Sequence, residues 1–135
     1  MSEEDNMFKI EDSTIHVTRG DIGTIGISTK DEVTGEPYKF KTGDVVRLKV
    51  FAKKDHSDVV LQKDIKVQEG ETTEVDMFLD MEDTKIGDII NKPKEYWYEV
   101  ELNPDTAPQT IIGYDDEEGE KLFMLYPEGG DVIEP

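Results

Sequence analysis

The residues with the most obvious chemical potential are two histidines, because histidine is the commonest metal ligand and proton-transfer side chain. His16 lies between apolar residues in TIHVT, and His56 lies in the polar stretch KKDHSD. Neither has a second histidine at metal-ligand spacing, and the 135-residue chain contains no cysteine. A transition-metal site needs more nitrogen or sulfur ligands than this. We therefore expect two solvated surface histidines and no metal or other cofactor.

Carboxylates are abundant, with 33 aspartates and glutamates in the chain. A glycosidase needs two of them at a defined separation, one of them in an apolar cleft that raises its pKa. The densest run, DDEEGE at residues 115–120, has the opposite character. It also lacks the alternating spacing and distal glutamate of a calcium loop. We interpret this run as a solvated loop tip.

Motifs for nucleophiles and phosphate binding are missing or out of context. No serine lies in a G-x-S-x-G elbow. The glycines of RGDIGTIG precede an alternating stretch typical of a strand, whereas a phosphate-binding loop requires a helix there. The RGD triplet at residues 19–21 is interpreted as a turn between strands. Together these features predict that the protein is not an enzyme.

The formal net charge of −18 limits the partners that the protein can have. A chain this acidic repels nucleic acid and anionic membranes, so we expect neither as a partner. The sequence holds no run of about 18 apolar residues that could cross a bilayer. Its acidic start, MSEEDNMFKI, does not resemble a secretion signal, and the lack of cysteine fits a reducing cytosol.

The elements that must position these residues are short strands. Apolar residues recur at every second position, which is typical of strands with one buried face. Glycine, proline and acidic residues separate the alternating segments, so about eight strands are expected at the spacing of a sandwich. The predicted class is all-β, with two sheets packed face to face. The segments are TIHVT, TIGIS, VVRLKVFAKK, VVLQKDIKV, TEVDMFL, EYWYEVEL, QTIIGY and KLFMLY.

One segment, MEDTKIGDIINKP, has a short helical pattern. Asp83 or Thr84 could cap a helical turn there. No other segment keeps a 3.6-residue period, so we expect a single helical turn. The isoleucines that could face the core from it are Ile86, Ile89 and Ile90.

The chain length suits a single domain. We place this domain at residues 13–127. A flexible acidic tail is expected at residues 1–12, and a flexible C-terminal tail is expected at residues 128–135.

The stretch EYWYEVEL carries the only tryptophan of the chain. Alternation puts Trp97 on the outward face together with two glutamates, and it puts Phe51 on the outward face of another strand. Large outward aromatic side chains are usually covered, so two explanations stay open. Either the helical segment 86–90 folds over this face, or a neighbouring subunit covers it. The inward row of the stretch would be Tyr96, Tyr98, Val100 and Leu102.

The succession of strand motifs resembles a known family. It is similar to the N-terminal immunoglobulin-like domain of the upper baseplate proteins of phages that infect Gram-positive bacteria, and to small uncharacterised tail proteins of Firmicutes phages. The likeness covers about Ser13 to Tyr126 and consists of strands and turns, which identify a scaffold better than an activity. The motifs are IHVTRGDIGTIGIS, GEPYKFKTGDVVRLKVF, VVLQKDIKV, TTEVDMFLDMEDT, EYWYEVEL and TIIGYDDEEGEKLFMLYPEG.

The resemblance implies an immunoglobulin-like β-sandwich that acts as a non-catalytic assembly module of a phage tail or baseplate. It implies that the partners are other virion proteins and further copies of the chain itself. The protein would be made in the cytoplasm of a bacterial host and would reside in the virion.

Two functions therefore remain as hypotheses. In the first, the outer sheet face engages neighbouring subunits, with an aromatic anchor supplying much of the affinity. In the second, the sandwich is a carbohydrate-binding module whose stacking platform is Trp97, Tyr114 and Tyr126. The candidate interaction surface is thus Trp97, Phe51, Tyr114 and Tyr126.

Overall fold

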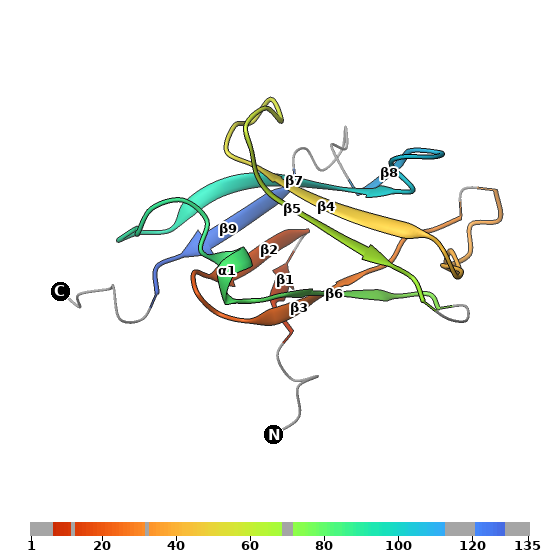
Figure 1. Cartoon of the computed structure of the whole chain (residues 1–135), viewed down its shortest axis with the longest axis horizontal. Coiled ribbons are helices and arrows are strands. Elements are labelled where there is room, and N and C mark those ends of the chain that lie inside the picture. The colour runs from red at the N-terminus through yellow and green to blue at the C-terminus, as the bar shows by residue number, and fades with distance from the viewer. Residues whose placement is uncertain (1–6, 12, 32, 69–71, 113–120, 129–135) are drawn as a thin grey trace, which may run out of the picture.

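The computed structural model describes residues 7–11, 13–31, 33–68, 72–112 and 121–128 (Figure 1). Within these residues the chain forms short strands and a single helical turn, α1 (Met81–Thr84), which confirms the all-β class. None of the helices in the described part is long and apolar enough to cross a membrane. The strands are β1 (Lys9–Glu11), β2 (Thr14–Thr18), β3 (Gly23–Ile27), β4 (Val45–Phe51), β5 (Val59–Lys66), β6 (Val75–Leu79), β7 (Lys94–Leu102), β8 (Gln109–Ile112) and β9 (Leu122–Tyr126).

The strands form two sheets of very different width, one above the other in Figure 1. The large sheet has the order β1-β2-β9-β7-β4-β5, with β8 also paired to β7, and the small sheet consists of β3 and β6. All pairs are antiparallel except β2 with β9. The run β9-β7-β4-β5 matches strands G, F, C and C′ of an immunoglobulin-like sandwich, and β3-β6 matches B and E. The predicted immunoglobulin-like sandwich is therefore confirmed.

Strand β7, the stretch EYWYEVEL, is the centre of the large sheet. One of its edges pairs with β4 over most of the length of β7. The other edge pairs first with β9 and then with β8, and a bulge between Val100 and Glu101 interrupts the pairing with β8. Strands β8 and β9 thus run in line on the same edge of β7. Its four inward residues are buried, as alternation predicts, and they are Tyr96, Tyr98, Val100 and Leu102.

The core lies between the sheets and is built from alternate residues of each strand. Strands β4 and β9 contribute Leu48 and Phe123, and β6 contributes Met77, all three of which are fully buried. Removing a fully buried side chain of this size from water stabilises the fold by roughly 1.5–3 kcal/mol. Phe40 also joins this core, although it lies in the connection between β3 and β4.

The helical turn differs in detail from the sequence prediction. It is capped by Asp80, whose carboxylate accepts a hydrogen bond from Asp83 N–H, while the Asp83 carboxylate accepts one from Asp80 N–H. This reciprocal capping box satisfies backbone donors at both residues, so the cap lies earlier than Asp83 or Thr84. The helix then ends at Thr84, before the three isoleucines. Ile86 packs in the core, whereas Ile89 is 68% exposed.

An inward lysine connects β5 to this cap. Lys63 lies opposite Leu48 on the inner face of the edge strand β5, and its Nζ donates to Asp83 Oδ2 at 2.8 Å. Partial burial acts to raise the pKa of Asp83, but the hydrogen bonds from Lys63 and the Asp80 N–H hold that pKa below its usual value. An inward-pointing charge on an edge strand also discourages pairing with other chains.

The ends of the domain lie further out than the sequence prediction placed them. Residues 9–11, expected in the tail, form β1 and pair with β2. At the other end, Glu128 accepts a hydrogen bond from Arg19 at 3.2 Å. Arg19 is buried and also donates to the backbone carbonyls of Ile86 and Gly87. The arginine of the RGD triplet is therefore a buried structural residue that connects these segments by hydrogen bonds, and it is not available on the surface.

Tyr98 gives a test of the packing on the inner face of the large sheet. Its hydroxyl donates to the Ser13 carbonyl at 2.7 Å, and burial raises its pKa to about 12. The neutral phenol is favoured in the fold, so stability is present below the unfolded pKa of about 10 and is lost as pH rises toward about 12. We expect Tyr98→Phe to lower the free energy of unfolding by about 1 kcal/mol near neutral pH. The deficit should shrink as the pH rises from about 10 toward about 12 in urea titrations; a constant deficit would contradict this.

Candidate interaction surface

The outer face of the large sheet divides into an apolar end and a charged end. On β7, Trp97 lies at the apolar end, between its register partners Phe51 of β4 and Leu122 of β9. Further along β7, Glu99 and Glu101 lie opposite two basic residues of β4, Lys49 and Arg47. Trp97 is half-buried, so part of the indole remains accessible. The tryptophan and the glutamates thus share a face but occupy different halves of it.

The aromatic residue beside Trp97 is covered by the chain's own loop. Phe51 is only 3% exposed, because the ring of His56 stacks on it at 4.4 Å with an angle of 5° between the planes. His56 belongs to the loop between β4 and β5, and its Nδ1 lies 3.0 Å from Glu99 Oε1. The observed cover for Phe51 is therefore His56, while Ile86 packs in the core instead. His56 is half-buried and is not the solvated residue expected from sequence.

At the charged end of the face, the basic and acidic side chains are joined by ion pairs. Arg47 donates two hydrogen bonds to Asp64, at 2.8 and 3.0 Å, and also contacts Asp105 at 3.2 Å. The bond from Arg47 holds the pKa of Asp64 below its usual value. Lys49 Nζ lies 3.4 Å from Glu101 Oε1.

Tyr126 lies on the same outer face, near the end of β9. Its hydroxyl lies 2.6 Å from His16 Nδ1, and the two rings stack at 5.7 Å. His16 is half-buried by this contact, so it also differs from the solvated histidine expected from sequence. Tyr126 is four residues along β9 from Leu122, the register partner of Trp97, so it is separate from the Trp97–Phe51 pair. Tyr114 lies outside the described residues.

Sequence reasoning missed a larger apolar surface on the small sheet. Thr24 of β3 is the register partner of Phe78 of β6, and on its other side it forms an isolated bridge to Met7. Thr84 of α1 bonds to Gly20 and Asp21 just before β3. Four large apolar side chains lie on or next to the outer face of this sheet, each 47–51% exposed. We call them the small-sheet patch; they are Met7, Ile22, Phe78 and Met81.

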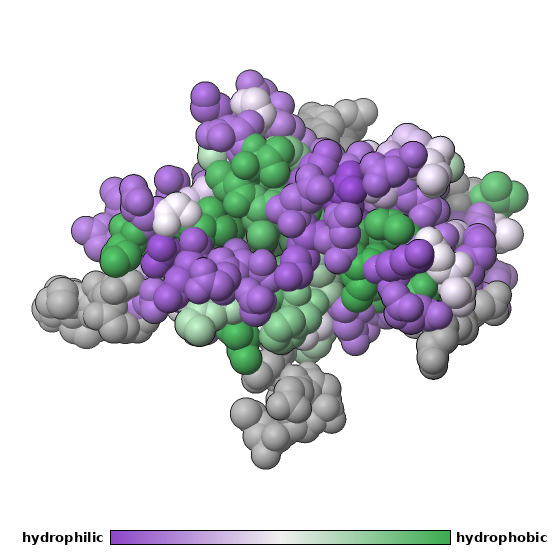
Figure 2. Space-filling model, viewed as in Figure 1, coloured by the Kyte–Doolittle hydropathy of each residue, from purple (hydrophilic) through white to green (hydrophobic). Residues whose placement is uncertain are grey.

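The small-sheet patch is visible as green surface along the lower margin of the molecule, over β3 and β6 (Figure 2). The alternation in TEVDMFL already puts Phe78 on the outer face, which was the available signal. Isolated apolar residues on a surface need no explanation, but several neighbouring ones mark a contact site. The sandwich therefore presents two apolar areas to solvent, one around Trp97 and one on the small sheet.

No protein-family model, curated protein or solved structure matches the chain. Across the described ranges, no group of three or more metal-ligating side chains is close enough to hold an ion. What the geometry defines is thus a β-sandwich with apolar outer surfaces.

Replacing the covering histidine tests the description of Phe51. His56 has a positive φ of 64°, which asparagine tolerates, so His56→Asn removes the ring without adding backbone strain. We expect the free energy of unfolding to fall by about 1 kcal/mol, the worth of a stacked aromatic pair. The measurement is urea denaturation followed by circular dichroism. The control Lys53→Ala, at an exposed loop position, should change stability by less than about 0.5 kcal/mol. Equal effects of the two variants would contradict a specific stack.

Proposed function

We propose that the protein is a non-catalytic assembly module that engages neighbouring subunits through the apolar outer faces of its sandwich. The observation that carries this proposal is the small-sheet patch, where four large side chains each remain about half exposed. An apolar face of a sheet is normally packed against another layer of structure, so the outer face of the small sheet is suited to contact a partner. The partly exposed Trp97 supplies a second apolar area on the opposite face.

Burial of this patch would supply a useful driving force. Each square ångström of apolar area removed from water contributes roughly 25 cal/mol, and large aromatic or sulfur-containing side chains often dominate interfaces. Phe78 and Met81 are of this type, and they lie at the same end of the small sheet as Ile22. A few such anchors surrounded by polar residues suffice for a specific contact.

The charge of the chain shapes the choice of partner. A net charge of −18 keeps free copies apart in solution, so assembly needs a contact whose apolar gain exceeds the repulsion or a partner that is neutral or basic. The resemblance of the strand motifs to upper baseplate domains supports a place in a phage tail or baseplate. Its partners there would be other virion proteins and further copies of the same chain.

A carbohydrate-binding role is the second candidate. It is supported by the partly exposed indole of Trp97 on the outer face of the large sheet, with Tyr126 on the same face. Exposed aromatic rings can stack on sugars, but the Tyr126 hydroxyl is already bonded to His16. The single tryptophan of the chain makes this role easy to test, because fluorescence reports on Trp97 alone.

The assembly role predicts that the native mass depends on the small-sheet patch. We expect the purified protein to form a homo-oligomer, and we expect Phe78→Lys to lower its mass by placing a charge in the buried contact. The measurement is multi-angle light scattering, with circular dichroism to show that the strands remain. The matched control is Val33→Lys, because Val33 is 93% exposed and lies outside the patch. A wild-type protein that stays monomeric at high concentration would contradict self-assembly.

Trp97→Ala separates the two faces and the two functions. If the large-sheet face also contacts a subunit, this variant should lose mass while it keeps its strand signal. Quenching of Trp97 fluorescence by cell-wall polysaccharide, without a change in mass, would instead favour sugar binding. Detection of the protein by mass spectrometry in purified phage particles would test its place in a virion, and consistent absence from particles would contradict that place.

A further inference from the structure

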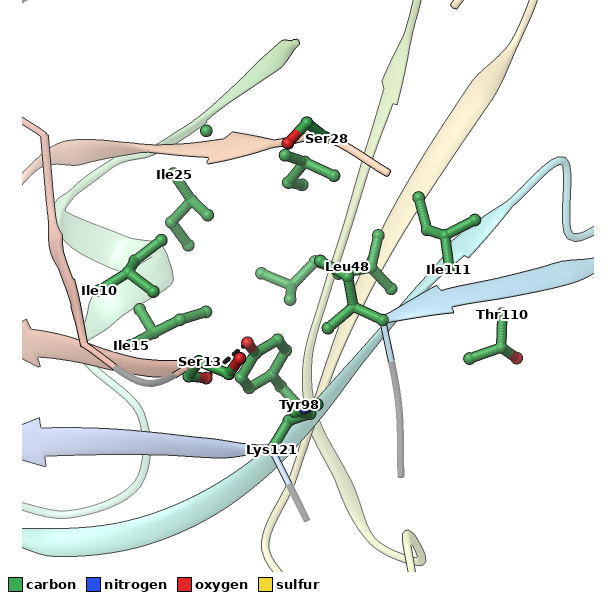
Figure 3. Close-up of a pocket in the computed structure, with 14 residues that line it drawn as sticks. Ile10, Ser13, Ile15, Ile25, Ser28, Leu48, Tyr98, Thr110, Ile111 and Lys121 are labelled. Atoms are coloured by element: carbon green, nitrogen blue, oxygen red, sulfur yellow. Dashed lines mark hydrogen bonds between the residues drawn. The ribbon is translucent and has the colours of Figure 1, made fainter. Parts of the chain in front are cut away.

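A groove opens between the two sheets, at the side where β3 faces β8. It has a volume of about 630 Å³ and is separate from the two outer faces described above. One rim is formed by residues 26–28 at the end of β3, and the other by residues 110–112 of β8 (Figure 3). We call this space the edge groove. The apolar residues of its lining that remain partly exposed are Ile10, Ile111 and Ile112, and beneath them lie the buried core residues Ile15, Ile25, Ile27, Leu48 and Val100.

The edge groove exists because the N-terminal segment changes sheets. Met7 forms a parallel bridge to Thr24, and Phe8 N–H donates to the Thr24 carbonyl at 2.9 Å. The next residues, Lys9–Glu11, leave the small sheet and pair with β2 in the large sheet. Within the described residues, β3 therefore has β6 on one edge but only this isolated bridge on the other.

The rims of the groove are strand edges with open backbone groups. The peptide groups of a strand alternate between its two edges, and the Thr24 carbonyl points toward Phe8. The peptide groups of Gly26, and of Ser28 by continuation, then point to the same edge, beyond the place where Phe8 has turned away. On the opposite rim, β8 pairs with β7 alone among the described strands. Two open edges thus face a space with an apolar base.

The charges around the groove favour a particular kind of occupant. Its described lining contains no carboxylate, and its single basic residue, Lys121, is buried. The inward side chains of an occupant should therefore be apolar. The chain as a whole carries a net charge of −18, so basic residues on either side of the apolar part would be attracted. A rim of three residues spans about 10 Å, which fits a short extended segment.

We propose that the edge groove binds an extended segment of a partner protein by β-strand addition. This inference rests on the assembly role proposed above and names the chemistry of the partner. The segment has β-branched or other apolar residues at alternate positions and lysine or arginine at its ends. Its backbone pairs with the free edge next to Gly26 and Ser28, and its inward side chains contact the partly exposed Ile10, Ile111 and Ile112. Main-chain hydrogen bonds supply affinity, and the alternate pockets supply specificity.

The test uses three fluorescent peptides of the form Lys-X-Thr-X-Thr-X-Lys, in which X is valine, isoleucine or leucine. We expect at least one to bind the wild-type protein with a rise in fluorescence anisotropy. Ser28→Pro removes a backbone donor on the rim and should weaken binding at least tenfold. The matched control Ser28→Ala keeps that donor and should bind like the wild type. Ser28 is exposed, and circular dichroism checks that both variants fold.

A second measurement leaves the protein unchanged. Each peptide is also made with N-methyl groups on alternate residues, which removes its own backbone donors on one edge. We expect the methylated peptide to bind at least tenfold more weakly, whereas a peptide methylated on the other edge should keep its affinity. This comparison tests whether the peptide binds through the backbone donors of one edge, even where Ser28→Pro fails to fold.

Several outcomes would overturn the inference. These are failure of all three peptides to bind, equal binding of both methylated forms, or loss of binding in Phe78→Lys but not in Ser28→Pro. A dimer that dissociates in Ser28→Pro would show that a second copy of the chain fills the groove and would replace the proposed partner. By contrast, a monomeric wild type that still binds the peptides would contradict self-assembly through the small-sheet patch and leave the edge groove standing.

Discussion

The whole molecule depends on β7 being paired along both of its edges. Its pairing with β4 on one side and with β9 and β8 on the other fixes which residues of four strands face inward. A slip of one residue would turn Tyr96 and Tyr98 out and Trp97 and the glutamates in. The core therefore holds the register, and the register in turn places Trp97 beside Phe51 and Glu99 beside His56. The packing between the sheets and the chemistry of the outer face have the same origin.

The unequal width of the two sheets explains why the edge groove and the apolar outer face of the small sheet are exposed. A small sheet of two strands cannot cover a much wider partner, so other groups complete the inner face of the large sheet. At the β5 side, Lys63 reaches to Asp83, and α1 lies beside β6. At the β8 side nothing comparable is found in the described part of the chain, and the edge groove lies there. The small sheet also keeps an apolar outer face, which a sandwich of this size normally avoids.

Alternation in the sequence was enough to predict the strands and the two-sheet sandwich, but not the contacts between distant segments that complete it. The inward row of β7 and the strands around Leu48, Met77 and Phe123 followed from period-two patterns, because those patterns are local. The cap at Asp80, the stack of His56 on Phe51 and the crossing of Phe8 between sheets depend on contacts between distant segments. The edge groove also depends on such contacts, because a strand edge is open only where no other segment of the chain pairs with it. The outer position of Phe78 was predictable, but its grouping with Met7 and Ile22 was not.

The parallel pair of β2 and β9 determines how the domain carries mechanical tension. These strands lie near the two ends of the domain, run in the same direction and are neighbours in the large sheet. When the chain ends are pulled apart and β1 has peeled away, β2 is drawn backward while β9 is drawn forward. The hydrogen bonds between them are then sheared together instead of breaking one after another. The sandwich would resist stretching along this axis better than a domain whose end strands can be unzipped.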